Sequence, residues 1–182
     1  MRIISGKHRS RVIKMVDIDT TRETTDKIRG AIFNLISFYP IDGIVLDLFS
    51  GSGAMGLEAL SRGARKAYFN DLGKKAYLTT KDNCRTLGYS DEVIITNLDY
   101  KKALTLYKEP FDLVFLDPPY KLDCCNEVID YLEKNNLLSP DGFIICEVDK
   151  DTIINETENL EIYKEKNYGI RNVYILKYKK NI

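Results

Sequence analysis

A carboxylate, two prolines and an aromatic ring stand together in this chain of 182 residues. Asp117-Pro118-Pro119-Tyr120 directly follows residues 111–116, an apolar run with the length and composition of a buried strand. Ligands of open parallel sheets bind outside the carboxyl ends of the strands. Because a prolyl nitrogen carries no hydrogen, this turn offers acceptors rather than donors. The tetrapeptide therefore suits an exocyclic amine on a nucleobase, with Asp117 and a backbone carbonyl accepting its hydrogens and Tyr120 stacking on the base. A purely structural role, in which the prolines end the strand and Tyr120 packs elsewhere, is the alternative.

A second candidate site is a glycine-rich segment between a predicted strand and a predicted helix. Gly51, Gly53 and Gly56 have the G-x-G-x-x-G spacing, which lets the backbone turn tightly and approach a ligand without an intervening Cβ. This spacing fits dinucleotide enzymes and also methyltransferases that use S-adenosylmethionine. The candidate cofactor-binding residues here are Asp47, Phe49, Gly51, Ser52, Gly53 and Gly56.

Two further acids follow the next two predicted strands. Asp71 ends the second strand, where a carboxylate can accept hydrogen bonds from both ribose hydroxyls of a nucleoside. Asp99 follows the third strand and is placed to accept from an adenine amino group, although a helix N-cap is a good structural alternative. Acceptors at three successive strand ends predict a nucleoside-shaped crevice.

The elements that must position these residues alternate between strands and helices. A helix is predicted to start at Thr24-Thr25-Asp26, with a threonine N-cap and an acid in its first turn. Gly30 inside this helix would weaken it by about 1 kcal/mol relative to alanine, so we expect a close approach that requires it. Strands are predicted at residues 44–49, 66–71, 93–96, 111–116, 142–148, 160–166 and 173–178, and further helices at 54–62, 74–87, 100–107 and 126–134.

This order of elements predicts an α/β fold of the Rossmann-like type. The sheet is expected to be doubly wound and mostly parallel, with seven strands and an antiparallel edge formed by the last strands. Ile3-Ile4 and Val12-Ile13 are predicted to pair as a short N-terminal β-hairpin across Gly6. We predict a single domain over residues 1–182, made of a basic N-terminal arm (1–20) and a catalytic core (21–182).

The composition argues against a membrane protein and against a zinc protein. The chain is 44% hydrophobic and 30% charged, and no apolar stretch approaches the length of a membrane span. Its first residues turn polar and basic before an apolar segment forms, so a cytoplasmic location is expected. Four cysteines without C-x-x-C spacing and a single histidine, His8, argue against a zinc site and a serine–histidine triad, and we expect no metal.

Charge is balanced overall but uneven along the chain. The formal net charge is zero, yet the first 14 residues hold five basic side chains and no acid. Such a segment either contacts phosphates or is simply a solvated terminus. The candidate RNA-binding residues are Arg2, Lys7, Arg9, Arg11, Arg22 and Arg29.

These motifs together look like a class I methyltransferase that acts on an amino group. Residues 2–7, 22–29 and 56–64 add a resemblance to one branch, the bacterial 16S rRNA guanine-N2 methyltransferase family, over nearly the whole chain. Glu23, Gly30 and Gly73 depart from that family's pattern, and Gly73 stands where a second acid is expected after Asp71.

The resemblance implies S-adenosylmethionine as the cofactor and methyl transfer to the N2 amine of a guanine in 16S rRNA, within an assembling small ribosomal subunit. Together with the composition, it leads us to expect no association with a membrane, and the sequence gives no sign of an obligate protein partner. The resemblance assigns Asp117, Pro118, Pro119 and Tyr120 to catalysis and adds Thr24 to the cofactor-binding residues. The segment 22–29 would contact either RNA or the cofactor.

Three other functions stay open at this point. Adenine-N6 methyltransferases of DNA share the Asp-Pro-Pro-Tyr element, although this chain has no room for a separate target-recognition domain. A nicotinamide-dependent oxidoreductase would explain the glycine spacing and Asp71 alone. A non-catalytic RNA-binding or assembly module on a methyltransferase scaffold is the third.

Overall fold

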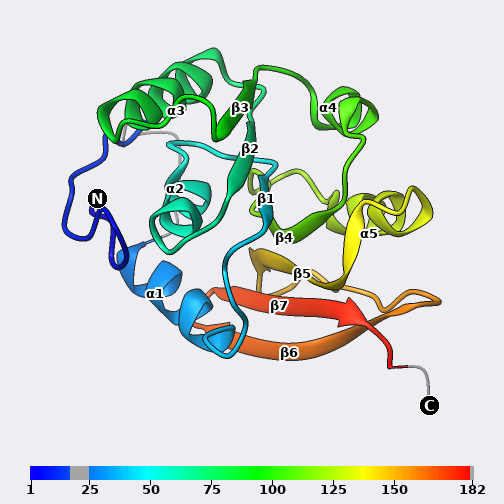
Figure 1. Ribbon diagram of the computed structural model, residues 1–182. Coiled ribbons are helices and arrows are strands. Elements are labelled where there is room, and N and C mark those ends of the chain that lie inside the picture. The colour runs from blue at the N-terminus through cyan, green and yellow to red at the C-terminus, as the bar shows by residue number, and fades with distance from the viewer. Residues whose placement is uncertain (17–24, 181–182) are drawn as a thin grey trace.

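The computed structural model describes residues 1–16 and 25–180, in which helices and strands alternate until three consecutive strands follow the last helix (Figure 1). The strands are β1 (Ile44–Asp47), β2 (Lys66–Asn70), β3 (Val93–Thr96), β4 (Phe111–Leu116), β5 (Leu138–Asp149), β6 (Leu160–Tyr168) and β7 (Arg171–Tyr178). The helices are α1 (Asp26–Leu35), α2 (Ala54–Ser61), α3 (Lys74–Thr86), α4 (Tyr100–Leu106) and α5 (Cys125–Lys134).

The strands form a seven-stranded sheet in the order β3-β2-β1-β4-β5-β7-β6. The first five pair in parallel, and β7 runs antiparallel to both β5 and β6. Strand order reverses direction on either side of β1, which makes the sheet doubly wound. The predicted fold class, including its antiparallel edge, is confirmed.

Helices cover both faces of this sheet, with α1, α2 and α3 on one side and α4 and α5 on the other (Figure 1). Successive residues of a strand point to opposite faces, so Val45 packs in the core under α1, α2 and α3 while Leu46 packs under α4 and α5. Burial on both faces explains why the strands read as continuous apolar runs.

Several strand boundaries differ from the prediction, and two of these differences have a clear local cause. The turn that leads into the glycine-rich loop begins at Leu48, so β1 ends at Asp47 and not at Phe49. β5 begins at Leu138, before Gly142, because its pairing with β4 continues through a register shift between Phe111 and Leu113. Gly142 lies inside this irregularity, where a Cβ would come within 2.8 Å of Leu138 Cδ1. The glycine therefore marks a bulge and not the start of a strand.

The first helix begins as predicted, but its glycine has a different meaning. Thr25 is the N-cap of α1 and its side chain accepts from the backbone N–H of Ile28, while Asp26 occupies the first turn. The prediction of a close approach at Gly30 is wrong, because an added Cβ would meet only Ile4 Cδ1 at 3.5 Å, an ordinary contact.

The N-terminal residues fold back across Gly6 as predicted, but the pairing is shifted: Ile3 bonds to Arg11 and Ser10, and Ile13 bonds to Met1. Arg2 and Val12 form an isolated antiparallel bridge, and Gly6 turns the chain with a φ of +84°. Among the described residues, no helix is long and apolar enough to cross a membrane.

Candidate functional site

The ends of four parallel strands bring the candidate residues to one edge of the sheet. Asp47 at the end of β1 lies opposite Phe69 in β2 and Phe115 in β4, and Asn70 lies opposite Thr96 in β3. The segments that follow these strands therefore lie side by side in the order β3, β2, β1, β4. Along this edge lie, in the same order, Asp99 after β3, Asp71 after β2, the glycine-rich loop after β1 and the tetrapeptide after β4.

The three glycines of the motif, of which Gly56 already lies in α2, are required for two different reasons. Gly51 and Gly53 have φ values of +55° and +83°, a backbone region that favours glycine. A Cβ at Gly51 would have no atom within 4 Å, so the loop leaves open space there. At Gly56 a Cβ would lie 2.3 Å from the ring of Phe69, so this glycine allows α2 to pack closely on β2.

Asp47 supports the loop from behind. Its side chain is 4% exposed, and its Oδ2 accepts a hydrogen bond of 3.1 Å from the backbone N–H of Gly56. Burial raises the pKa of Asp47 to about 7, although the Gly56 N–H opposes the shift. This placement favours a role in holding the loop over direct contact with a ligand.

Side chains of α3 fix the same loop, which the sequence analysis missed. Thr80 donates its hydroxyl to Gly51 O at 2.9 Å, and Asn83 donates to Ser52 O at 2.9 Å. Both residues are buried. Thr80 and Asn83 are spaced three residues apart, so the sequence indicates that they share one face of α3. This spacing does not reveal which groups the two side chains bind.

Asp71 joins the loop to the end of β2. Its Oδ2 accepts from Gly51 N at 2.9 Å and its Oδ1 accepts from Gly73 N at 2.8 Å. Gly73, which replaces an expected acid, thus contributes a backbone donor that holds the remaining carboxylate. Each carboxylate oxygen can accept more than one hydrogen bond, so the predicted contacts with ribose hydroxyls are compatible with this geometry.

Asp99 caps α4, the structural alternative that the sequence left open. Its Oδ1 accepts from Lys101 N at 2.9 Å, and the side chain is exposed at the strand edge. Phe49, another candidate cofactor-binding residue, packs against the ring of Tyr100 with 5.6 Å between ring centroids. Capping and recognition of an amino group do not exclude each other, so the second role stays a prediction.

The tetrapeptide leaves β4 as expected. Pro118 is buried, Pro119 is exposed and the ring of Tyr120 is 75% exposed. The ring is therefore not packed into the core, and it is accessible to a planar ligand. Asp117 accepts a hydrogen bond of 2.8 Å at Oδ1 from Arg171 Nη2.

Arg171 brings further charge to this corner, and the sequence analysis did not single it out. Its Nε donates to Glu147 Oε1 at 3.2 Å and its Nη1 donates to Asp149 Oδ1 at 3.0 Å. Burial alone would lower the pKa of Arg171. The carboxylates of Asp117 and Glu147 outweigh this effect, and the net result is a raised pKa. A small pocket beside the tetrapeptide has Arg171 in its wall, together with Pro118 and Tyr120. A larger hollow of about 480 Å³ lies between α4 and α5, away from these groups.

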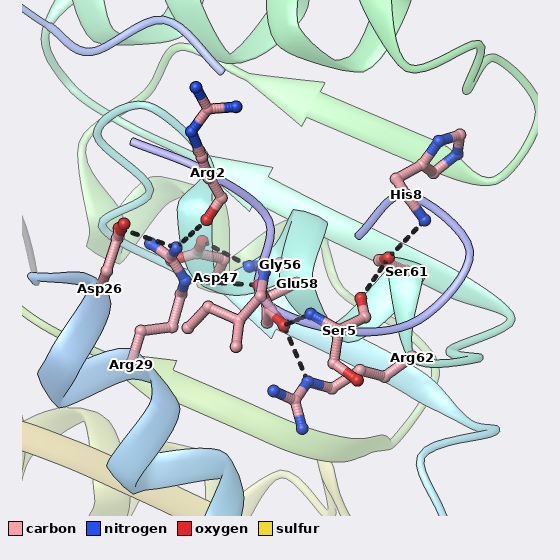
Figure 2. A network of polar contacts seen from close by, with 11 residues as sticks. Arg2, Ser5, His8, Asp26, Arg29, Asp47, Gly56, Glu58, Ser61 and Arg62 are labelled. Carbon is pink, nitrogen blue, oxygen red and sulfur yellow. Dashed lines mark hydrogen bonds and ion pairs between the residues drawn. The ribbon is translucent and has the colours of Figure 1, made fainter. Parts of the chain in front are cut away.

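A buried carboxylate of α2 helps to hold the N-terminal arm, together with hydrogen bonds at Ser61. Figure 2 shows Glu58 among groups from the arm, α1 and α2. Its two oxygens accept from the backbone N–H groups of Ile4 and Ser5 at 2.9 and 3.0 Å. Arg62 Nε donates to Oε1 at 2.9 Å, and Arg29 Nε lies 3.4 Å from Oε2. The arm is thus docked next to the helix that follows the glycine-rich loop.

Arg29 corrects one of the RNA-binding predictions. The side chain is fully buried, and its Nη2 donates to Asp26 Oδ1 at 3.0 Å and to the backbone carbonyl of Arg2. Because its charge is already paired with Glu58 and Asp26, it does not face a phosphate. Its position was readable from α1, where Arg29, Ile32, Phe33 and Ile36 are spaced as one helical face and all are buried.

The remaining RNA-binding candidates fall into two groups. Arg2, Lys7, Arg9 and Arg11 are exposed on the arm, so contact with phosphates stays a prediction for them. Arg22 and the cofactor candidate Thr24 lie outside the described residues.

The geometry as a whole can bind a nucleoside and an amine-bearing base at adjacent strand ends. The first would lie against the open loop at Gly51 and the acids beyond β2 and β3, and the second against the tetrapeptide beyond β4. Within residues 1–16 and 25–180, no group of three or more His, Cys, Asp or Glu side chains is arranged to hold a metal ion.

Comparisons with known proteins agree in pointing to one family. A family model described as "Conserved hypothetical protein 95" matches residues 1–177. The YlbH protein of Bacillus subtilis is 38% identical over 181 residues, which cover 97% of this chain and 98% of that protein. Ribosomal RNA small subunit methyltransferase D of Haemophilus influenzae is 36% identical over 175 residues, covering 93% of this chain and 90% of that protein. The solved structure of the yhhF protein of Escherichia coli has a TM-score of 0.88 and 29% identity, with 98% of both chains covered.

Proposed function

The chain belongs to the family described as conserved hypothetical protein 95, and from this premise we propose that it transfers a methyl group from S-adenosylmethionine to the exocyclic N2 amine of a guanine in 16S ribosomal RNA. Family membership confirms the resemblance found in the sequence motifs. The observation that supports the proposed chemistry best is the position of Asp117-Pro118-Pro119-Tyr120, directly beside the glycine-rich loop, because β4 and β1 are paired neighbours.

The loop and the two acids fit the proposed cofactor. The open space at Gly51 admits a ligand close to the backbone, and Asp71 beside it offers acceptors for ribose hydroxyls. Asp99 would accept from the adenine amino group at the next strand end. When bound, S-adenosylmethionine supplies a methyl group that its positively charged sulfur has already activated for transfer. The protein's task is therefore placement of the amine and exclusion of water.

The tetrapeptide would hold the base. Asp117 and the Pro118 carbonyl accept the two hydrogens of the amine, which keeps the nitrogen lone pair directed at the methyl group. The negative charge of Asp117 stabilises the positive charge that develops on this nitrogen as the N–C bond forms and the bond between the methyl group and sulfur breaks. The methylated nitrogen then gives up one proton to solvent when the product leaves. The exposed ring of Tyr120 stacks on the base. A guanine reaches this corner only from a loop or after it turns out of a helix.

A small ribosomal subunit under assembly is the proposed form of the substrate. The chain has a formal net charge of zero, whereas binding of free RNA is driven mainly by contacts between basic side chains and phosphates. A pre-shaped particle reduces the need for such charge. The relative from Haemophilus influenzae is named a ribosomal RNA small subunit methyltransferase, which supports RNA of the small subunit as the substrate.

The test is methyl transfer from labelled S-adenosylmethionine to small ribosomal subunits that lack the modification, with free 16S rRNA and duplex DNA in parallel, followed by nucleoside analysis. Label in N2-methylguanosine of the rRNA is the expected result, and an Asp117→Ala variant should bind the cofactor within a few-fold of the parent without turnover. Label in N6-methyladenine of DNA would instead identify a DNA enzyme. Absence of label with intact RNA binding would point to a non-catalytic module, and binding of NADH in preference to S-adenosylmethionine would point to an oxidoreductase.

A further inference from the structure

Arg171 reaches the proposed catalytic carboxylate from a different part of the chain. It is the first residue of β7, which lies between β5 and β6 in the sheet (Figure 1). Antiparallel pairing sets Arg171 opposite Asp149 at the end of β5, and β5 pairs in turn with β4, which ends just before Asp117. The antiparallel part of the sheet therefore places a cation at the corner where β4 ends.

The guanidinium of Arg171 is divided among three carboxylates. Nη2, Nε and Nη1 lie 2.8, 3.2 and 3.0 Å from oxygens of Asp117, Glu147 and Asp149. The Arg171 side chain is 11% exposed and that of Asp117 is 22% exposed, so these ion pairs are well shielded from water. A planar guanidinium that is held on two other sides has one orientation left for the third contact.

We propose that Arg171 is a positioning residue, which holds the Asp117 carboxylate in the orientation that accepts the amine of the target base. The inference rests on the proposed function. Glu147 and Asp149 fix the guanidinium, the guanidinium fixes Asp117 Oδ1, and the carboxylate keeps further acceptor capacity for the amine. Three carboxylates outnumber the single positive charge of the guanidinium, so the arginine alone does not cancel the charge that stabilises a developing cation.

An ion pair that only stabilised the fold would behave differently from a positioning contact. Loss of a fold contact lowers the free energy of unfolding and leaves the kinetic constants of the folded fraction unchanged. Loss of a positioning contact lowers kcat, because misplacement of a group by about 1 Å can cost roughly 100-fold in rate. Affinity for the cofactor, which binds at β1 and β2, should hardly change.

The experiment compares Arg171→Gln, Arg171→Lys and Asp117→Asn with the parent, using small ribosomal subunits as substrate. Lys177→Gln is the matched control, because Lys177 belongs to the same strand and pairs with Glu161 at 4.0 Å, away from the tetrapeptide. For each folded variant, kcat and KM for both substrates are measured, and S-adenosylhomocysteine binding is followed by calorimetry.

We expect Arg171→Gln to lower kcat by roughly 100-fold. KM for S-adenosylmethionine and the affinity for S-adenosylhomocysteine should stay within about threefold of the parent. Arg171→Lys keeps the charge but cannot span three carboxylates. Its kcat should therefore lie between those of Arg171→Gln and the parent. Because both residues act through one contact, Arg171→Gln should add little to the loss in an Asp117→Asn background. Lys177→Gln should match the parent.

The outcomes separate this inference from the proposed function. An active parent with a parent-like kcat for Arg171→Gln would overturn the role of Arg171 alone, as would additive losses in the double variant. If Arg171→Gln does not fold, a parent-like kcat for Arg171→Lys would equally overturn the proposed role of Arg171. A parent that binds S-adenosylhomocysteine but methylates nothing would remove the proposed function, and this inference with it.

Discussion

Asp47 shows how a single buried group can make this fold sensitive to pH. Its carboxylate lies behind the glycine-rich loop, where burial raises its pKa to about 7. In the unfolded chain the same group has an ordinary pKa near 4. Between these two values the folded state keeps a proton that the unfolded state has lost. Stability from this residue is therefore complete below about pH 4 and is lost as the pH rises to about 7.

Asp47→Asn should remove that dependence. The amide oxygen can still accept from Gly56 N, and it carries no charge to bury. We compare the free energy of unfolding of the variant with that of the parent at each pH. This difference should shift in favour of the variant by on the order of 2 kcal/mol when the pH rises from 5 to 7.5. Urea unfolding at both pH values measures this change. Asp91→Asn, a substitution at an exposed position, is the control, and equal pH slopes for the Asp47 variant and the parent would contradict the assignment.

Single residues also mark where inference from the sequence succeeded and where it stopped. Asp117, Asp71 and Gly51 could be found because each follows an apolar strand, and strand ends of a parallel sheet meet at a known edge. Arg171 could not, because its distance from Asp117 depends on the pairing of β5 with β7 and no local pattern reveals that register. Arg29 was misread as a surface cation, although its place on the buried face of α1 was visible.

Among the elements, α2 depends most on its surroundings. All eight of its residues are buried, and one of them is Glu58. A buried carboxylate is costly unless donors surround it, and here the arm, α1 and the end of α2 supply them. The docked arm is thus part of the setting that holds α2, and with it the glycine-rich loop, in place. Sequence periodicity predicts the helix but not the origin of these donors.

Gly6 packs closely against the end of α2. An added Cβ would lie 1.8 Å from the backbone oxygen of Ser61, and Gly6 has a φ of +84°. Gly6→Ala should displace the arm, with more hydrogen exchange at the amides of Ile4 and Ser5 and a free energy of unfolding lower by roughly 2 kcal/mol.

A matched control for this change exists in Gly88. Its φ of +81° imposes the same backbone strain on alanine, but a Cβ there has no atom within 4 Å. Gly88→Ala should therefore cost only the strain, about 1 kcal/mol. Equal losses for the two variants, or unchanged exchange at Ile4 and Ser5, would show that close packing of the arm on α2 contributes nothing.

On the scale of the whole molecule, the exposed charges of the arm lie on the α2 side of the sheet. A main-chain hydrogen bond joins Lys7 to Ser61, and Arg11 donates to the backbone of Thr86 at the end of α3. The exposed lysines Lys102, Lys108 and Lys134 belong to the α4 and α5 side instead. Composition alone gave the basic arm, but only the fold shows that it is fixed in place as part of one face. A fixed basic face can orient the proposed RNA substrate relative to the tetrapeptide.

Removal of this basic face should weaken RNA engagement without harming the chemistry. In a variant with Lys7→Ala, Arg9→Ala and Arg11→Ala, we expect KM for small ribosomal subunits to rise by roughly tenfold and its dependence on salt to decrease, with a logarithmic slope smaller by about 2 if all three side chains contact phosphates. The affinity for S-adenosylhomocysteine and the kcat at saturating subunits should stay near those of the parent, because the strand-end groups are unchanged. Kinetics at several salt concentrations measure these quantities. The triple variant Lys102→Ala, Lys108→Ala and Lys134→Ala removes the same charge from the opposite side of the sheet, and an equal rise in KM for this control would mean that total charge, and not the arm, determines binding.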